Sequence, residues 1–203
     1  MALLVGCQSD ISTPFPPGLT PFDDMNPVPD PTDLTSQTLV MQTDDTGYIH
    51  VYGKGFIQAS PEALWAASKN PPVMYATCST DEQDVTIEDE KDFEFAFQVH
   101  YTVTEIVTVD WHDEWRYGVI DGTDDAIVDT MIKHQKITGS SFIKRSEGTI
   151  QFAATANPDV TLVSFTEHLN AVSGSDGDVK NGMQHNFDAL VATTHGQAIP
   201  DCP

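Results

Sequence analysis

The sequence predicts an α+β domain: a curved antiparallel sheet of about six or seven strands around one long C-terminal helix, with two short helices after the first strand. Between Asp84 and Val172, apolar and polar residues alternate in successive segments, as in half-buried strands. From Asp178 to His195 the apolar residues instead recur at helical spacing on one side. A long sheet followed by a helix with one apolar face is expected to curl around that helix.

The C-terminal helix is predicted from its apolar stripe. Asp176 or Asp178 is suited to cap its start, and Gly196 follows it where a left-handed C-terminal cap is favoured. Four polar residues are expected outside the stripe: Lys180, Gln184, His185 and Asp188. The stripe itself is formed by Val179, Met183, Phe187, Leu190 and Val191, with Thr194 beside it.

The first strand and the first helix are predicted from residues 47–70. Gly47–Gln58 contains alternating aromatic and aliphatic residues, which is typical of a strand. Ser60 is then suited to cap a helix, with Pro61 in its first turn and Glu62 complementing the N-terminal dipole. We expect this helix to end near Asn70.

A second short helix is expected from Pro71 to about Cys78, followed by a polar loop at Asp81–Asp84. The strands after it are separated by short turns, so neighbours should pair antiparallel. Turns are expected at Asp121-Gly122, Thr138–Ser140 and Asn157–Asp159. The six predicted strands are Val85–Glu90, Phe93–Val103, Val107–Tyr117, Ile127–Ile137, Phe142–Ala153 and Val160–Val172.

Composition excludes several functions. The chain has 203 residues, with 31 Asp and Glu against 9 Lys and Arg, a formal net charge of −22, so nucleic acid is a poor partner. Asp121–Asp125 and Ser175–Asp178 are acidic loops, but neither has the spacing of a known calcium loop. The histidines show no metal spacing, and no nucleophile elbow, phosphate loop or dinucleotide motif is present. We therefore predict no metal and no cofactor.

The N-terminal region is predicted to be an anchor and a tether. Leu4-Val5-Gly6-Cys7 resembles a bacterial lipobox, which implies lipidation of Cys7 and makes residues 1–7 the remnant of a lipoprotein signal, although only six residues precede the cysteine. Residues 8–46 are rich in Pro and Asp, which predicts a disordered tether ahead of a domain at 47–203. By this resemblance, Gln8 after the cysteine favours the outer membrane. The alternative is an ordinary disordered N-terminus.

The two remaining cysteines are consistent with export. If Cys7 is lipidated, Cys78 and Cys202 form an even pair, and a disulfide between them would hold the C-terminal tail to the domain. The alternative is two free thiols in a reducing compartment.

Three local features resemble one known superfamily. Gly55–Trp65 is similar to its entry into the first helix, and Gln135–Ser140 with Glu147–Ile150 is similar to its paired strands before the last hairpin. With the final amphipathic helix, they resemble the START and polyketide-cyclase-like (SRPBCC) superfamily over about Gly47 to Gly196. The resemblance implies the helix-grip fold and a cavity under the C-terminal helix for a lipid, sterol, polyketide or other apolar molecule. Catalytic residues vary across the superfamily, so none is carried over.

Charged residues that interrupt buried stripes are the candidates for a ligand site. Asp113, Glu167 and Lys133 fall on stripes expected to face inward, where a charge is costly unless it is paired or borders a cavity. The alternatives are that these charges mark strand ends, or that the register slips by one residue and turns them outward. We expect the apolar part of a ligand to be held by Phe97, Trp111, Trp115, Phe165, Met183 and Phe187.

The primary expectation is binding or carriage of a hydrophobic small molecule or lipid on a membrane-tethered, exported lipoprotein. A cyclase- or aromatase-like enzyme is the runner-up, with Glu167 or Asp113 as its general base. A third reading is a structural or interaction module whose cavity is filled by its own side chains. An empty cavity of roughly 300 Å³ or more would favour ligand binding.

Overall fold

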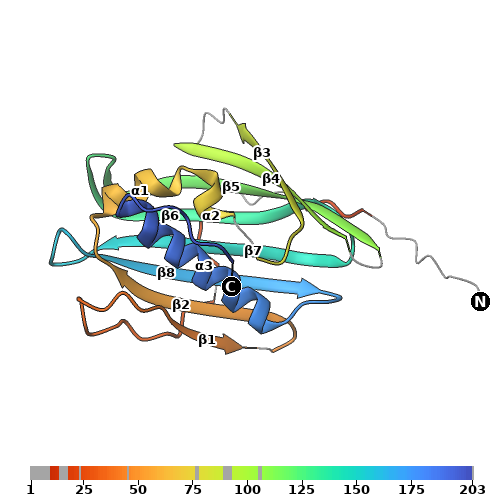
Figure 1. The fold of residues 1–203 in the computed structure, drawn as a ribbon, viewed down its shortest axis with the longest axis horizontal. Coiled ribbons are helices and arrows are strands. Elements are labelled where there is room, and N and C mark those ends of the chain that lie inside the picture. The colour runs from red at the N-terminus through yellow and green to blue at the C-terminus, as the bar shows by residue number, and fades with distance from the viewer. Residues whose placement is uncertain are drawn as a thin grey trace, which may run out of the picture.

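The computed structural model describes residues 10–13, 18–22, 24–44, 46–75, 78–88, 93–104 and 107–202. Within these ranges the chain forms one antiparallel sheet in the order β1-β2-β8-β7-β6-β5-β4-β3 (Figure 1). Its strands are β1 (Val40–Asp44), β2 (Ile49–Ile57), β3 (Glu82–Glu88), β4 (Phe95–Thr104), β5 (Thr108–Thr123), β6 (Ala126–Gly139), β7 (Ile143–Ala154) and β8 (Thr161–Ala171).

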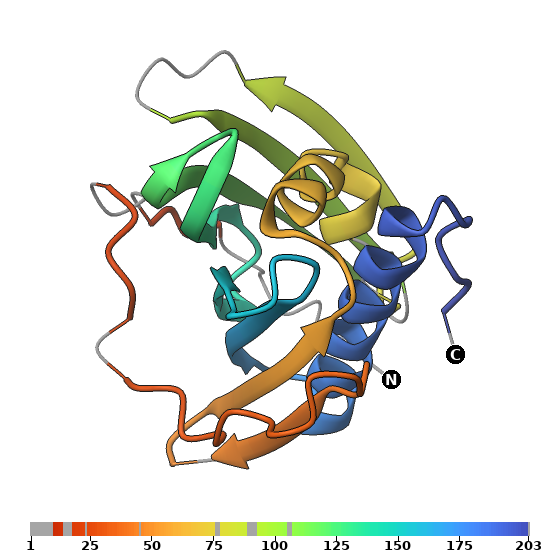
Figure 2. The same ribbon diagram turned by 90° about the vertical axis from the view of Figure 1, so that its left-hand side faces the viewer.

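Three helices cover one face of this sheet: α1 (Pro61–Ser68), α2 (Pro71–Met74) and α3 (Asp176–Thr194). The sheet is curved, and the helices lie on its concave side (Figure 2). α3 contacts β2, β8, α1 and α2. This arrangement confirms the predicted α+β fold, a curved antiparallel sheet around a C-terminal helix. No helix among the described residues is long and apolar enough to cross a membrane.

The helix starts follow from local sequence. The Ser60 side chain accepts a hydrogen bond from the backbone N–H of Ala63, as predicted for the N-cap of α1. At α3 the cap is Ser175, not the predicted Asp176 or Asp178, and it forms a capping box with Asp178. His185, predicted outside the apolar stripe of α3, is buried.

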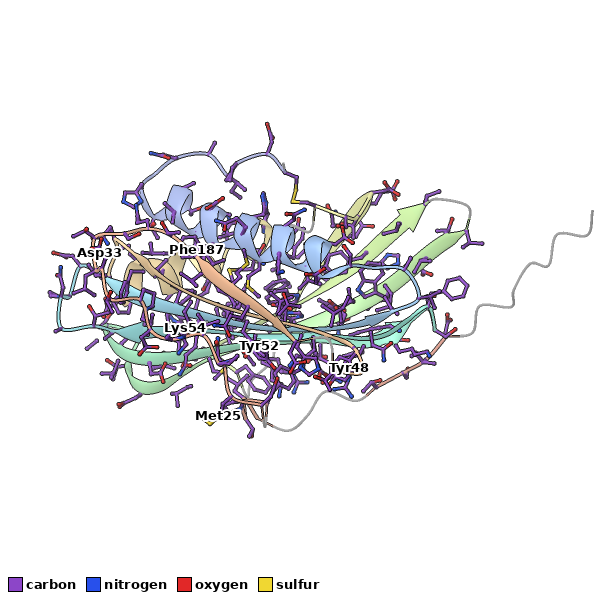
Figure 3. All side chains as sticks on the ribbon, turned by 90° about the horizontal axis from the view of Figure 1, so that it is seen from below. Met25, Asp33, Tyr48, Tyr52, Lys54 and Phe187 are labelled. Carbon is purple, nitrogen blue, oxygen red and sulfur yellow. A yellow bond between two sulfur atoms is a disulfide. The ribbon has the colours of Figure 1, made fainter. Side chains whose placement is uncertain are left out.

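Close contact between α3 and β2 requires small residues on the strand. A Cβ atom at Gly55 would lie 2.9 Å from Cε2 of Phe187, and one at Gly53 would lie 2.7 Å from Sδ of Met183. Met183 and Phe187 are both buried at this contact, and Phe187 is on the α3 side of the sheet in Figure 3. The glycines of β2 therefore let the apolar stripe of the helix pack directly on the sheet.

Residues 20–22 and 24–30 of the predicted tether lie on the outer face, the face of the sheet turned away from α3, where Lys133 and Lys54 contact Thr20 and Asp30. The backbone N–H groups of Ile11 and Thr13 donate to carbonyls of Gly139 and Ile137, at 2.9 and 2.8 Å. Val28 is 1% exposed, and Met25 lies on the side opposite α3 in Figure 3. The composition of residues 8–46 predicts an extended tether, but the described residues of that range pack on the sheet, and β1 extends it.

Cys78 and Cys202 form a disulfide in the structure, with Cα atoms 5.3 Å apart and a sequence separation of 124. The bond joins the C-terminal tail to the segment that follows α2. Cys7, the predicted lipidation site, lies outside the described residues, so the lipobox stays a prediction.

Candidate functional site

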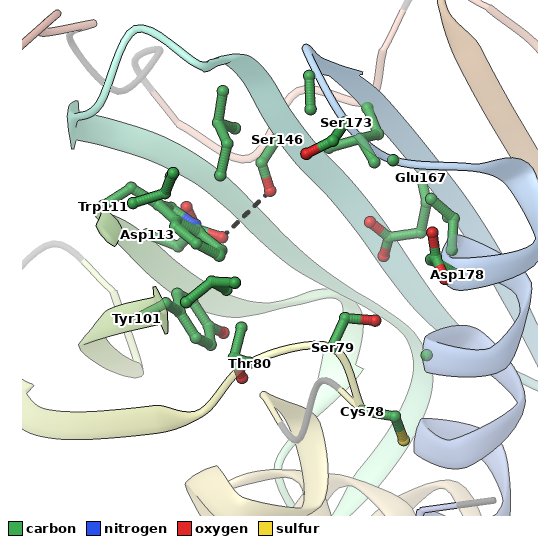
Figure 4. Close-up of a pocket in the computed structure, with 18 of the residues that line it drawn as sticks. Cys78, Ser79, Thr80, Tyr101, Trp111, Asp113, Ser146, Glu167, Ser173 and Asp178 are labelled. Carbon is green, nitrogen blue, oxygen red and sulfur yellow. Dashed lines mark hydrogen bonds between the residues drawn. The ribbon is translucent and has the colours of Figure 1, made fainter. Parts of the chain in front are cut away.

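A pocket of about 730 Å³ lies between α3 and the concave face of the sheet. Its walls come mainly from β4, β5, β8, α3 and the loop that joins β8 to α3, and most of them are apolar. The pocket is within the range of small-molecule sites, roughly 300–1,000 Å³. Figure 4 shows side chains from the sheet and from α3 converging on this space.

The structure brings some of the predicted site residues together at this pocket and places others elsewhere. Phe97, Phe165 and Phe187 are buried in the core rather than at the pocket wall. Phe97 packs beside the wall, because it is the cross-strand neighbour of Trp115 and its ring stacks on that of Trp115 with centroids 5.5 Å apart. The predicted residues that line the pocket are Trp111, Asp113, Trp115, Glu167 and Met183.

Lys133 lies on the outer face, which corrects the inward position predicted for it. Its ammonium group donates to the carbonyl of Thr20 at 2.8 Å and lies 4.4 Å from the centroid of the Phe22 ring. On β6 it is His134 that points into the pocket, one position from the prediction. Because the N-terminal segment covers the outer face, both faces of β6 are buried, and hydrophobic alternation does not specify which side faces α3.

A row of residues across four strands forms the polar part of the wall. Trp115 on β5 pairs with His134 on β6, His134 pairs with Gly148 on β7, and Gly148 pairs with Glu167 on β8. His134 Nε2 lies 3.1 and 3.0 Å from the two carboxylate oxygens of Glu167. The pair therefore bridges over the strand that carries Gly148.

Gly148 makes this bridge possible. A Cβ atom there would lie 2.3 Å from His134 Nε2 and 2.4 Å from each carboxylate oxygen of Glu167. A glycine within a strand often marks a bulge, but the role of Gly148 in the structure is to leave room for two polar side chains. Trp115 fixes the other side of the imidazole by stacking on it, with ring centroids 4.2 Å apart.

Asp113 lies beside this row and is 4% exposed. The Ser146 hydroxyl donates to its Oδ2 at 3.3 Å (Figure 4), and His134 Nδ1 lies 3.9 Å from the same oxygen. Burial raises the pKa of the Asp113 carboxyl to about 7, although the His134 charge and the Ser146 hydrogen bond act in the opposite direction. Near neutral pH, Asp113 therefore exists in both its protonated and its ionised form.

His134 is held as a partner of Glu167. Burial acts against the charged imidazole, but the charge of the Glu167 carboxylate and its hydrogen bond outweigh it, and Asp113 adds to them. The pKa of His134 is consequently raised above its ordinary value. The pair places an imidazole ring, fixed by stacking on Trp115, beside a carboxyl group that titrates near neutrality.

His134 and Ser146 are site residues that the sequence did not reveal. A lone histidine within a strand carries no motif, and a search for metal-ligand spacing does not select it. Its role becomes visible only when the register of β6, β7 and β8 is known, because its partner lies 33 positions away in the chain.

The outer face carries a second polar cluster. Tyr52 donates to Asp24 Oδ2 at 2.6 Å, and His168 Nε2 lies 2.6 Å from the same oxygen. One ligand atom each from Asp24, His50 and His168 lies within 4.8 Å of the others, a grouping suited to a metal that spacing along the chain does not indicate. In the structure these groups hydrogen-bond to one another and hold the N-terminal segment on the sheet. Of the two predicted acidic loops, Ser175–Asp178 uses the Asp178 carboxylate in the helix cap.

No protein-family model and no curated protein sequence matches the chain. Solved structures do match it. A STAR-related lipid transfer protein from Xanthomonas axonopodis is 10% identical over 77% of this chain and 92% of its own, with a TM-score of 0.55. The chain has the START-like fold. A START superfamily protein from Mycobacterium smegmatis, 12% identical over 72% of this chain and 97% of its own, has a TM-score of 0.50.

A third START-like structure is the Zhui aromatase/cyclase from Streptomyces sp. R1128, with 10% identity over 72% of this chain and 93% of its own and a TM-score of 0.49. The Xanthomonas and Mycobacterium structures establish the START-like fold, which agrees with the resemblance found in the sequence.

Proposed function

We propose that this START-like domain binds or carries a hydrophobic small molecule in the pocket under α3. The observation that carries the proposal is the pocket itself, a space of about 730 Å³ whose walls are largely apolar and aromatic. A module with a self-filled core would leave no space of this size. Solved neighbours of the same fold include a protein named for lipid transfer, which supports a hydrophobic ligand.

A blocked-pocket variant tests the proposal. Gly182 on α3 lines the pocket, and an added Cβ atom would meet nothing within 4 Å, so Gly182→Phe should place a ring in the space without disturbing the helix. Asn181 is its exposed neighbour and is not part of the lining, so Asn181→Phe is the matched control. We expect the naphthalene dye ANS to bind the wild type and the control but not Gly182→Phe, as measured by dye fluorescence. Equal binding to all three proteins would contradict the proposal.

Natural ligand can be sought directly. Mass spectrometry of an organic extract of the purified protein should detect an apolar compound that is depleted in an extract of Gly182→Phe. An identical extract from both proteins would contradict carriage of such a compound in this pocket.

A second candidate function is acid–base catalysis on the bound molecule, of the cyclase or aromatase kind. Asp113 favours it, because its pKa of about 7 lies near an operating pH at which one group can both accept and donate a proton. If the extracted compound is converted to a product by the wild type but not by Asp113→Asn, the domain is an enzyme. Recovery of the compound unchanged from both would leave binding alone.

We also propose that the domain is carried on an exported lipoprotein anchored in the outer membrane. The lipobox-like Leu4–Cys7 supports this, as does the Cys78–Cys202 disulfide, since disulfides persist in oxidising compartments. Growth of a bacterial host with an alkyne-tagged fatty acid should label the protein expressed from its full gene, and Cys7→Ser should remove the label. Labelling that survives Cys7→Ser would contradict lipidation at this residue.

A further inference from the structure

Four buried polar atoms on the sheet wall of the pocket have no hydrogen-bond partner among the described residues. They are Nε1 of Trp111, Nε1 of Trp115, Oδ1 of Asp113 and Nδ1 of His134. Their residues are 8%, 3%, 4% and 6% exposed, and all four line the pocket. On the α3 side of the pocket, Oδ1 of Asn186 is a fifth such atom. A buried polar group without a partner costs roughly 1–3 kcal/mol, so several of them in one pocket indicate that something else supplies the partner.

These atoms lie close together on the wall. His134 Nδ1 is 3.9 Å from Asp113 Oδ2, and Trp111 precedes Asp113 by two residues on β5. Figure 4 shows Trp111 and Asp113 side by side, with the Ser146 hydroxyl bonded to the carboxyl group. Ser146 engages only Oδ2, which leaves Oδ1 of Asp113 for another group.

The unpartnered groups are mainly donors. An indole nitrogen is always a donor. When the His134 imidazole carries both of its protons, Nε2 donates to Glu167 and Nδ1–H is left to donate. Asp113 also offers a donor when its carboxyl group is protonated. The group that satisfies Trp111, Asp113 and His134 on this wall is therefore a hydrogen-bond acceptor, such as a carbonyl oxygen.

Charge excludes the ionic alternatives. A ligand carboxylate would add a negative charge beside Glu167 and Asp113 in a buried space, and Asp178 also lines the pocket. A ligand cation would meet the indole N–H of Trp111, which cannot accept a hydrogen bond from it. An uncharged oxygen avoids both costs.

We infer that the ligand of this pocket is an uncharged apolar molecule with a carbonyl oxygen, which is received by Asp113, His134 and Trp111. The inference rests on the proposed function and names the chemistry that the polar wall selects. Recognition by the protonated Asp113 makes it dependent on pH, because ionisation removes one donor and sets a carboxylate against the carbonyl oxygen.

Several other polar groups face Asp113, and one of them is a buried cation. The ammonium group of Lys136 donates to the carbonyl oxygens of Gly139, Ser140 and Ile143 at 3.2, 2.7 and 2.6 Å, so it is held at the β6–β7 turn. The titratable and polar groups facing Asp113 are Tyr101 from β4, His134 and Lys136 from β6, Ser146 from β7 and Glu167 from β8, with Asp178 of α3 across the pocket. Desolvation of Asp113 is the largest influence on its pKa, ahead of all of these charges.

Two near-isosteric probes test the inference. Benzophenone and diphenylmethane differ only in the carbonyl oxygen, and diphenylacetate carries a carboxylate instead. At about pH 6, calorimetric titration should show benzophenone binding about tenfold more tightly than diphenylmethane, the worth of one or two buried hydrogen bonds. At about pH 9 the advantage should be lost, while diphenylmethane binds as before. Diphenylacetate should bind more weakly than benzophenone at both values.

Variants of Asp113 separate the effect of its hydrogen-bond donor from the effect of its titration. Asp113→Asn keeps an N–H donor that does not titrate, so the preference for benzophenone should persist at about pH 9. Asp113→Leu should abolish the preference at every pH. Asp110→Asn is the matched control, the same change on the same strand outside the pocket lining, and should behave as the wild type. Thermal melting of each variant establishes that it is folded.

The outcomes distinguish the two proposals. Equal affinity of the wild type for benzophenone and diphenylmethane, or tighter binding of diphenylacetate, would overturn the inference and leave a hydrophobic pocket. A preference for benzophenone that does not change with pH would overturn the role of the Asp113 proton. No binding of any of the three compounds would overturn the proposed function, and the inference with it.

Discussion

Replacement of Gly148 by Ala tests the polar wall most sharply. The new Cβ atom would lie 2.3 Å from His134 Nε2 and 2.4 Å from both Glu167 oxygens, well inside the 3.0 Å that real contacts respect. The His134 ring is stacked on Trp115 and cannot retreat, so the flexible Glu167 side chain must move. The variant therefore separates the pair while the rest of β7 stays unchanged.

The cost follows from what the pair contributes. A hydrogen bond to a charged group contributes about 1.5–3 kcal/mol to stability, and the Glu167 side chain is 18% exposed, which favours the lower part of that range. Replacement of a glycine by alanine by itself raises the free energy of unfolding by about 0.4–1 kcal/mol, because it lowers the conformational entropy of the unfolded chain. We expect Gly148→Ala to lower the free energy of unfolding by about 1–2 kcal/mol.

Gly182→Ala is the matched control. An added Cβ atom at this position of α3 meets nothing within 4 Å, so the same substitution should raise the free energy of unfolding by about 0.5–1 kcal/mol. Urea unfolding near neutral pH, with the disulfide intact, measures both variants. Gly148→Ala should also lower the pKa of His134, followed by NMR, since the imidazolium loses its partner. If Gly148→Ala were as stable as Gly182→Ala, the reasoning about the His134–Glu167 pair would be wrong.

Two further predictions concern stability. The folded-state pKa of Asp113, about 7, lies above its ordinary value of 3.8, so ionisation destabilises the folded wild type as the pH rises between these values. Each pH unit of pKa difference corresponds to about 1.4 kcal/mol. Between about pH 4 and about pH 8, the free energy of unfolding of Asp113→Asn, measured in urea, should therefore rise by about 4 kcal/mol relative to that of the wild type. A difference that stays constant with pH would contradict the burial of this charge. Removal of the disulfide by Cys78→Ser with Cys202→Ser should lower the free energy of unfolding by about 2–5 kcal/mol, because the two cysteines are 124 positions apart and the bond closes a long loop. A melting temperature unchanged from that of the wild type would contradict this contribution.

The sequence predicted the architecture because its strands are half-buried. Six apolar residues alternate from Phe93 to Val103, and such a pattern has one arrangement that buries the apolar face. The start of α1 was also predictable from the sequence, because Ser60 and Pro61 act on residues next to them in the chain. Information that is local in the chain was thus recoverable.

The candidate site was only partly predictable from the sequence. Its chemistry depends on how the strands pair and on which face of the sheet the N-terminal segment covers. Asp113 and Glu167 interrupt stripes of clear polarity, and both line the pocket. Lys133 was misplaced because the N-terminal segment buries the second face of β6, which removes the contrast that alternation needs. The packing of the N-terminal segment on β6 was not predicted, because the composition of this segment is typical of disorder. In the structure Asn26, within the segment, donates to the carbonyls of Gly53 and Phe165.

The three tryptophans offer the most direct measurement on the ligand pocket. Trp111 and Trp115 line it, whereas Trp65 on α1 donates its indole N–H to Asp124 outside it. In a nitrogen-15 correlation spectrum titrated with benzophenone, the indole signals of Trp111 and Trp115 should shift together to saturation while that of Trp65 stays in place. Indole signals that all remain unmoved, or a shift confined to Trp65, would contradict a ligand site between α3 and the sheet.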